Sequence, residues 1–172
     1  RIIVCGAGQV GSSIARQLAG EANDVTLIDH DAEIVRKRAD TLDVRCIHGN
    51  ASLPDVLADA GAKSADMLIA VTFSDEVNMI ACQVGHSIFG IPEKIARVRH
   101  QSYLDRTWVD LYRADHMPID LIISPEIEVA RAIERRLEVP GALDMLRFGD
   151  DKLRVISIRC EEKCPVINTP LR

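Results

Sequence analysis

The chain has 172 residues, a formal net charge of −5 and 47% hydrophobic residues, while aromatic side chains make up only 3%. This length predicts one domain of ordinary size, or one domain and a fragment, with a core of aliphatic side chains and alanine. The acidic balance without a basic stripe argues against a nucleic-acid partner, and the longest apolar runs are too short to cross a bilayer.

The N-terminal segment predicts a strand, a glycine-rich turn, a helix and a second strand. A strand-like run at 1–5, apolar from Ile2 onward, precedes the pattern Gly-x-Gly-x-x-Gly, a helical pattern covers 9–19, and a second strand-like run at 24–29 ends in an aspartate. The first glycine permits a tight turn, the second lets the backbone approach a pyrophosphate, and the third lets the helix pack close to the strand. The start of the helix favours phosphates through its N–H groups and dipole. The residues of this turn that we expect to hold a nucleotide are Gly6, Ala7, Gly8, Gln9, Val10 and Gly11.

Asp29, the last residue of the second strand, indicates which nucleotides fit. Its carboxylate can accept hydrogen bonds from ribose hydroxyls and would repel a 2′-phosphate, so NAD is favoured over NADP. The adenosine of ATP or AMP presents the same ribose diol, so Asp29 does not separate NAD from ATP. The alternative is a Rossmann-like turn that has lost its ligand.

Strand-like and helical patterns then alternate as far as residue 138. Further strands are expected at 44–47, 67–71, 94–98 and 119–123. Further helices are expected at 32–41, after a cap at Ser52, from a cap at Ser74 or Asp75 to Ile88, at 103–112 and from Ser124 to Leu137. The apolar positions with helical period in the segment before Ile88 are Val77, Ile80, Ala81 and Val84. Altogether the pattern predicts an α/β fold with a doubly wound, Rossmann-like sheet of six parallel strands.

The rhythm changes after Pro140 and Gly141. Apolar runs at 142–148 and 153–158 with polar residues between them predict a hairpin. The remaining residues are too few for an independent core. We therefore expect a nucleotide-binding domain at residues 1–138 and the truncated beginning of a small α+β subdomain, or an arm, at residues 139–172. Because Arg1 is not an initiator methionine, we expect that the natural N-terminus lies upstream or has been trimmed.

Three further loops are expected to face the nucleotide, because parallel sheets bind ligands at their carboxyl edge. Asn50 follows the third strand and can read an adenine edge, or belongs to an ordinary turn. Thr72 and Phe73 follow the fourth strand and are expected on the ribose or base, with a cap or turn role as the alternative for Thr72. Arg97 lies at the end of the fifth strand, where its charge needs a phosphate or an acid such as Glu126.

Motifs for catalysis and metal binding are missing from the sequence. It has no P-loop, no Tyr-x-x-x-Lys pair and no Gly-x-Ser-x-Gly elbow. The five cysteines predict free thiols in a reducing cytoplasm, and Cys160 and Cys164 lack the second half of a metal site. Arg99 and the five histidines are expected to be surface or turn residues. A nucleotide site without catalytic groups indicates a sensor and not an enzyme.

Together these motifs resemble the regulator-of-potassium-conductance (RCK) family, also called the KTN domain, over essentially all of residues 1–138. The Asp-Glu-x-Asn sequence at 75–78 and the helix after it are more diagnostic than the glycines. The segments that carry the resemblance are 6–11, 27–29, 65–72, 74–82 and 95–98. The sequence from Pro140 to Leu143 resembles the entry to the family's C-terminal ligand-binding subdomain. Full-length relatives carry two such tandem units, so this chain resembles the first half.

The resemblance implies a regulatory subunit that is not an enzyme. Such subunits bind NAD, NADH, ATP or ADP and form homo-oligomeric rings through their RCK domains. They are cytoplasmic, peripheral on the inner face of the plasma membrane, and gate potassium flow through an integral-membrane transporter subunit. Helix faces around 77–88 and 103–112 would be candidates for subunit contacts, with burial in the same chain as the alternative.

By position, the resemblance implies that the glycine-rich turn, Asp29, Thr72, Phe73 and Arg97 would hold the nucleotide. Asn50 stands where many relatives have aspartate, which leaves base recognition open. Two rival interpretations remain, an NAD-dependent dehydrogenase fragment and an interaction module with a vestigial nucleotide site.

Overall fold

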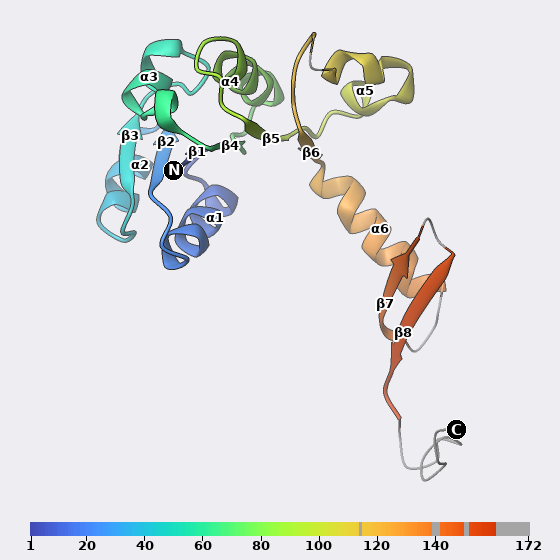
Figure 1. Cartoon of the computed structure of the whole chain (residues 1–172). Coiled ribbons are helices and arrows are strands. Elements are labelled where there is room, and N and C mark those ends of the chain that lie inside the picture. The colour runs from blue at the N-terminus through green and yellow to red at the C-terminus, as the bar shows by residue number, and fades with distance from the viewer. Residues whose placement is uncertain (114, 139–141, 150–151, 161–172) are drawn as a thin grey trace. The chain divides into compact units, whose positions relative to one another are not determined.

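The computed structural model describes the chain except residues 114, 139–141, 150–151 and 161–172 (Figure 1). The chain divides into two compact units, Arg1–Pro125 and Glu126–Arg172. The division between these units precedes the last predicted helix, whereas the predicted domain boundary at residue 138 follows that helix. The predicted boundary stays a prediction.

The first unit is built around a sheet of six strands in the order β3-β2-β1-β4-β5-β6, and every neighbouring pair is parallel. This arrangement confirms the predicted doubly wound sheet. The chain runs outward from β1 to β3 and then returns to β4 on the other side of β1, so the topological switch point lies between β1 and β4. The strands are β1 (Ile2–Cys5), β2 (Val25–Asp29), β3 (Arg45–His48), β4 (Met67–Ala70), β5 (Glu93–Arg97) and β6 (Leu121–Ile123).

Helices cover both faces of this sheet, with α1 on one face and α3 and α4 on the other (Figure 1). Alternate residues of a strand point to opposite faces. Ile2 and Val4 accordingly belong to the core that includes Ala15 of α1, whereas Ile3 and Cys5 belong to the core beneath α3 and α4. Burial on both faces explains why the central strands β1 and β4 are continuous apolar runs. The helices of this part are α1 (Gln9–Gly20), α2 (Ala32–Ala39), α3 (Pro54–Asp59), the 3-10 turn η1 (Ala62–Ser64) and α4 (Asp75–Ser87).

Helix α4 begins as predicted, and its apolar stripe is partly buried and partly exposed. Ser74 is its N-cap, and the Ser74 hydroxyl accepts the Val77 N–H at 3.2 Å. Ile80 and Ile88 are 42% and 59% exposed, whereas Ala81 is buried and Val84 packs against the core, so only part of the apolar stripe faces the sheet. The inner side combines small and polar residues, because it packs closely on β4 and β5. The buried residues of α4 are Asp75, Asn78, Met79, Ala81, Cys82 and Gly85.

The helix predicted at 103–112 was wrong in its extent. The chain forms a short α5 (Gln101–Leu104), becomes extended at Asp105, and continues as the 3-10 helix η2 (Arg106–Tyr112). The break has a local cause, because the Asp105 carboxylate accepts the Thr107 N–H at 2.8 Å and starts a new helical segment. These hydrogen bonds to Thr107 hold the pKa of Asp105 below its ordinary value.

The predicted cap of α3 was also wrong. The residue before the helix is Leu53, which makes no side-chain cap, and Pro54 occupies the favoured first position. Ser52 instead donates its N–H and its hydroxyl to Asn50 Oδ1, at 3.0 and 2.9 Å. Asn50 therefore holds the turn before α3, and Ser52 is a donor in this turn and not the cap of the helix.

The second unit contains most of helix α6 (Pro125–Glu138) and a pair of strands, β7 (Ala142–Phe148) and β8 (Leu153–Ile158). The helix begins at the proline, as the sequence predicts. Strands β7 and β8 are antiparallel neighbours, which confirms the predicted hairpin. The expected remainder of the C-terminal subdomain, with Cys164, lies outside the described residues.

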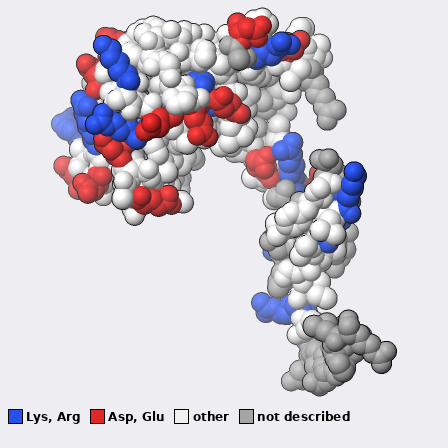
Figure 2. All heavy atoms as spheres, in the orientation of Figure 1, with Lys and Arg blue, Asp and Glu red and all other residues white. Residues whose placement is uncertain are grey.

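The surface charge of the first unit is mixed on the face that Figure 2 shows, where acidic and basic side chains lie among one another. In the part of the chain that the structure describes, no helix has the length and apolarity that crossing a bilayer requires.

Candidate nucleotide-binding site

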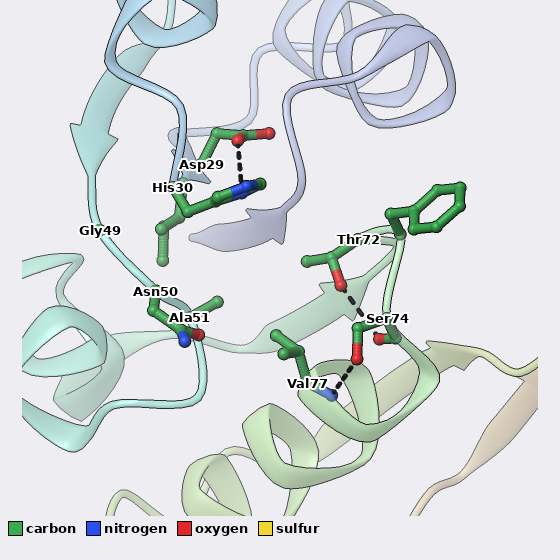
Figure 3. Close-up of a pocket in the computed structure, with 10 residues that line it drawn as sticks. Asp29, His30, Gly49, Asn50, Ala51, Thr72, Ser74 and Val77 are labelled. Atoms are coloured by element: carbon green, nitrogen blue, oxygen red, sulfur yellow. Dashed lines mark hydrogen bonds and ion pairs between the residues drawn. The ribbon is translucent and has the colours of Figure 1, made fainter.

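A cavity of about 270 Å³ opens beside the switch point between β1 and β4 (Figure 3). The segments at the carboxyl ends of β2, β3 and β4 and the first turn of α4 line it. Doubly wound sheets bind ligands at this edge, and the volume lies near the lower end for small-molecule sites. The lining residues are Ile28, Asp29, His30, Gly49, Asn50, Ala51, Thr72, Phe73, Ser74 and Val77.

The glycine-rich turn lies against the β4 loop of this cavity. Gly6 has a φ of +103°, and a Cβ there would lie 2.9 Å from the Thr72 Cα. A Cβ on Gly11 would lie 1.8 Å from the carbonyl oxygen of Gly6, so helix and turn are in close contact. A Cβ on Gly8 would meet nothing within 4 Å. The first and third glycines are thus required by the fold, while Gly8 faces open space.

Asp29 connects the cavity to the glycine-rich turn. Its side chain is buried, and Oδ2 accepts the Ala7 N–H at 2.6 Å. Oδ1 accepts the Asp31 N–H at 3.0 Å and lies 3.1 Å from His30 Nδ1 (Figure 3). A carboxylate oxygen has more than one acceptor site, so Asp29 can hold the turn and still accept a ribose hydroxyl.

Two helix N-termini lie near the cavity, and they differ in charge. In α4 the first turn is acidic, Ser74 caps it, and the Ser74 hydroxyl donates to Glu76 at 2.7 Å. This hydrogen bond holds the pKa of Glu76 below its ordinary value. In α1 the N-cap Gly8 makes no side-chain cap and the first turn contains no acid. An anion is therefore favoured at the start of α1, where Gln9 and Val10 are exposed.

The turn is further fixed by two side chains that the sequence did not single out. The Ala7 carbonyl accepts the Ser12 hydroxyl at 2.7 Å and Arg38 Nε at 3.1 Å. Ser12 is buried in α1, and Arg38 reaches the turn from α2. Both contacts fix the position of the Ala7 carbonyl within the turn.

Three more of the predicted contact residues, Asn50, Thr72 and Phe73, line the cavity. The Asn50 side-chain oxygen accepts from Ser52, and no other described residue pairs with its amide N–H groups, so these can donate to a ligand. Phe73 lines the cavity and is 81% exposed. The Thr72 N–H and hydroxyl lie 2.8 and 2.7 Å from Asn78 Oδ1. With its hydroxyl hydrogen used in this way, Thr72 would meet a ribose as an acceptor.

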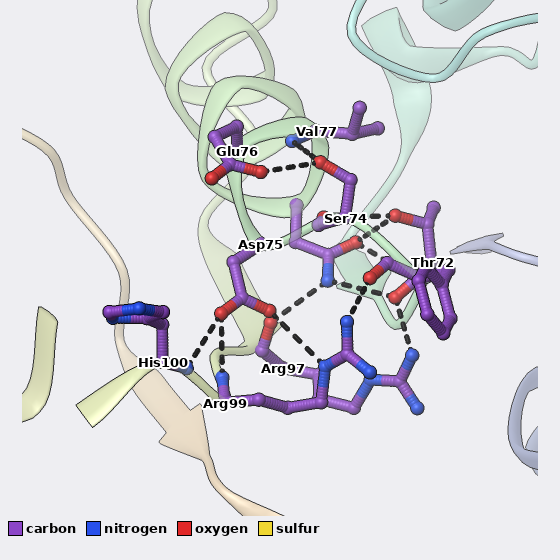
Figure 4. A network of polar contacts seen from close by, with 10 residues as sticks. Thr72, Ser74, Asp75, Glu76, Val77, Arg97, Arg99 and His100 are labelled. Atoms are coloured by element: carbon purple, nitrogen blue, oxygen red, sulfur yellow. Dashed lines mark hydrogen bonds and ion pairs between the residues drawn. The ribbon is translucent and has the colours of Figure 1, made fainter. Parts of the chain in front are cut away.

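The two arginines near the end of β5 face the same loop (Figure 4). Arg97 does not line the cavity, and its Nη2 donates to the Thr72 carbonyl at 2.6 Å. Arg99 differs from the predicted surface residue, since its side chain is only 31% exposed. Its Nε lies 3.5 Å from the buried Asp75, and its guanidinium carbon lies 4.4 Å from the centre of the Phe73 ring.

The fold thus brings Asp29, Asn50, Thr72 and Phe73 to one cavity, with the glycine-rich turn and Arg97 joined to it by hydrogen bonds. The residue that the sequence missed most clearly is His30, whose position next to Asp29 was the available signal. Val77 also lines the cavity, and the helical period that included Val77 did not indicate this position. Among the described residues, His, Cys, Asp and Glu side chains form no group of three or more suited to a metal ion.

The fold and the site are those of the doubly wound class of nucleotide-binding domains. The features that place the chain in this class are the glycine-rich turn, the helix start without a side-chain cap and the acid at the end of the second strand. The TrkA-N domain family model matches residues 2–125, and the chain belongs to this family.

A curated relative is the Trk system potassium uptake protein TrkA of Azorhizobium caulinodans, which is 53% identical over 171 residues. The match covers 99% of this chain but 37% of that protein, so the chain spans little more than a third of its relative. A solved TrkA-N domain, from the inner membrane protein ybaL of Escherichia coli, has a TM-score of 0.69 at 19% identity, covering 80% of this chain and 96% of that chain. The GsuK channel bound to NAD has a TM-score of 0.68 at 15% identity, covering 87% of this chain and 25% of that chain. At such identities the two structures show likeness of fold.

Proposed function

We propose that the chain is a nucleotide-binding unit of a regulatory subunit of a potassium-uptake system. Its ligand is NAD or NADH, with ATP or ADP as the alternative. The observation that carries the proposal is Asp29, a buried carboxylate that joins the glycine-rich turn to a cavity at the switch point. The name of the 53% identical relative supports the transport system, and the NAD of the GsuK channel supports the class of ligand.

In the proposed complex, the ribose of the adenosine lies on Asp29 and the base lies in the cavity toward Asn50. The pyrophosphate lies at Gly8 and the start of α1, where no side chain intervenes and no acid repels it. Phe73 offers a ring face at the edge of the cavity. Arg97 supports this loop through the Thr72 carbonyl.

The regulatory step needs no chemistry on the nucleotide. A ligand shifts a conformational equilibrium only if it binds one state more tightly than the other. Oxidised and reduced nicotinamide, or ATP and ADP, would differ in contacts across the cleft and bias a homo-oligomer. In this proposal the oligomer lies on the cytoplasmic face of the membrane, where it contacts an integral-membrane potassium transporter subunit and is not itself an enzyme.

Calorimetric titration of the chain with NAD, NADH, ATP and ADP tests the ligand, and NADP serves as the matched comparison. We expect at least one of the four to bind, and NAD to bind at least about tenfold more tightly than NADP, because Asp29 repels a 2′-phosphate. Failure of all four to bind to folded protein would favour an interaction module with a vestigial site. Turnover of NADH with carbonyl substrates would favour a dehydrogenase fragment.

Regulation is tested separately in the assembled system. Potassium transport through the membrane subunit should depend on which nucleotide is supplied to the regulatory subunit. Transport that no nucleotide alters would contradict the regulatory role while leaving nucleotide binding intact.

A further inference from the structure

Two polar residues of the Asp-Glu-x-Asn sequence are buried next to the cavity without lining it. Asp75 is 6% exposed and Asn78 is 0% exposed. Buried polar groups are costly unless they are paired, so the partners of these side chains indicate what they do.

The Asn78 side chain forms hydrogen bonds to the loop after β4 and to the end of β5. Its Oδ1 lies 2.8 and 2.7 Å from the Thr72 N–H nitrogen and hydroxyl. Its Nδ2 donates to the carbonyls of Arg97 and Thr72, at 2.8 and 3.2 Å. Every partner is part of β4, β5 or the loop after β4, so Asn78 fixes the loop on the sheet.

Asp75 instead reaches a segment that lies beyond the sheet. Its Oδ2 accepts the N–H groups of Arg99 and His100, at 2.9 and 2.8 Å (Figure 4). The start of α4 does not require this side chain, because Ser74 is the cap. His100 in turn is the N-cap of α5, where its Nδ1 accepts the Ser102 N–H at 3.4 Å. Asp75 therefore holds the backbone at the point where the segment 101–112 begins.

Arg99 joins Asp75 to the cavity. Its guanidinium lies over the Phe73 ring, with 4.4 Å from its carbon to the ring centre, and donates to the Phe73 carbonyl. Its Nε faces Asp75 Oδ1 at 3.5 Å, and within the described part of the chain neither buried atom has a hydrogen-bond partner. Because Arg99 lies over the Phe73 ring, a nucleotide that packs on this face of Phe73 would displace the cation that lies beside the Asp75 carboxylate among the described ion pairs.

We propose that Asp75 is a positioning residue that couples the nucleotide cavity to the segment 101–112, through Arg99 on one side and His100 on the other. The coupling rests on the proposed function, because it requires a nucleotide in the cavity. Removing the cation from a buried carboxylate is costly. When Arg99 shifts, we therefore expect the Asp75 side chain to move with it and to displace the backbone N–H groups that it holds. Nucleotide binding is thereby sensed at 101–112.

The chain contains its own probe for this segment, because its single tryptophan is Trp108 in η2. Trp108 is 58% exposed, so a change in its surroundings alters its fluorescence. Titration with NAD and with ADP, followed in parallel by calorimetry and by Trp108 emission, measures binding and coupling independently. Hydrogen exchange of peptides from 99–112 gives a second measure of the coupling.

The test variant is Asp75→Asn, whose amide oxygen can still accept the Arg99 and His100 N–H groups but carries no charge for the guanidinium. Asp120→Asn is the matched control. Asp120 also accepts a β5 N–H, that of Lys94 at 2.7 Å, and pairs with the Lys94 ammonium at 2.8 Å, but it does not line the cavity. A general loss of stability would affect both variants, whereas loss of coupling affects only the first.

We expect Asp75→Asn to bind NAD or ADP within about threefold of the parent affinity while its Trp108 response falls at least about fivefold. Asp120→Asn should keep the parent response. If Asp75→Asn does not fold, Arg99→Gln breaks the same link from its more exposed end and should also lose the response.

Three results would overturn the coupling. They are a full Trp108 response in Asp75→Asn or in Arg99→Gln, an equal loss in Asp120→Asn, and a parent protein that binds nucleotide without a change at 99–112 by either measure. The last result leaves the proposed function standing. Absence of any calorimetric binding by the parent would instead overturn the proposed function, and the coupling with it.

Discussion

The three glycines of the turn lack side chains for different physical reasons. At Gly6 both the φ of +103° and the Thr72 backbone exclude a Cβ, and at Gly11 the carbonyl oxygen of Gly6 excludes one. Gly8 has a φ of −64° and open space around its missing Cβ, so the free protein does not require glycine there. A closely approaching ligand is the physical reason that remains for Gly8.

A comparison of two alanine variants separates these reasons. Gly8→Ala should leave the free energy of unfolding within about 0.5 kcal/mol of the parent and weaken nucleotide binding at least about tenfold. Gly11→Ala should lower the free energy of unfolding by more than about 3 kcal/mol, because the clash is with backbone. Urea unfolding and calorimetry measure the two effects. Tight nucleotide binding by Gly8→Ala would place the pyrophosphate elsewhere.

Asp29 has a second role besides the one that the sequence predicts. We expect Asp29→Ala to weaken nucleotide binding by about 1.5–3 kcal/mol, the range for hydrogen bonds to charged groups. The variant should also lose about 1–3 kcal/mol of stability, because the Ala7 N–H loses its buried acceptor. Asp29→Asn is the control, since its oxygen can still accept from Ala7. Unchanged binding by both variants would remove Asp29 from the site.

At the scale of elements, β5 is anchored by an unusual buried charge. The Lys94 side chain is 3% exposed, and its ammonium donates to the carbonyls of Ile91 and Pro92 and pairs with Asp120 before β6. Burial raises the pKa of Asp120, but hydrogen bonds from the Lys94 side chain and backbone, together with its charge, outweigh this and lower the pKa below its ordinary value. The pair ties β5 to the segment that leads into the edge strand.

Lys94→Met should lower the free energy of unfolding by about 1–3 kcal/mol at neutral pH, because two carbonyls lose their donor. The depressed pKa of Asp120 contributes stability above its unfolded value of 3.8, and this contribution is lost as the pH falls through the lower folded value. The variant should therefore lose less stability than the parent on acidification. Urea unfolding at neutral pH and at about pH 3 measures the difference. Equal acid sensitivity of variant and parent would contradict the role of the pair.

At the scale of the whole molecule, the first unit is held by two aliphatic cores on opposite faces of one sheet. One of them contains two thiols, those of Cys5 and Cys82. Burial, and secondarily the nearby Cys82, raises the pKa of Cys5, and burial raises the pKa of Cys82 to about 12. Cys160 is exposed and serves as the reference within the same chain.

The buried thiols predict a loss of stability in alkali. Unfolded thiols ionise near pH 9.0, whereas the folded ones stay protonated, so the stabilising effect is complete below pH 9.0 and decreases as the pH rises toward the folded values. Each thiol should remove up to about 1.4 kcal/mol per pH unit above the unfolded pKa. Urea unfolding in mildly alkaline buffers tests this, with Cys5→Ala as a variant of shallower slope. Native alkylation, read by mass spectrometry, should modify Cys160 and spare Cys5 and Cys82.

Several elements could be predicted from the sequence because their signals are local. Strand periodicity, the glycine spacing and Pro125 at a helix start each reflect interactions within a few residues. The errors arose where a nearby side chain competed with the pattern. Asp105 divided a helix, and Asn50 took the hydrogen bonds expected of a cap at Ser52. In α4 the polar Asp75 and Asn78 share the buried side with apolar residues, which a helical period of apolar residues does not indicate.

By itself the sequence determined the class of sheet, the glycine-rich turn and most residues of the candidate site, since consecutive strand ends of a parallel sheet must meet at one edge. Only the tertiary structure decided which side chains hold that edge together. Asp29 contacts a turn 22 residues away, and Asp75 contacts a segment 24 and 25 residues away. Such contacts leave no periodic trace in the chain, because a buried carboxylate takes its partners from whichever segments the fold brings within hydrogen-bonding distance.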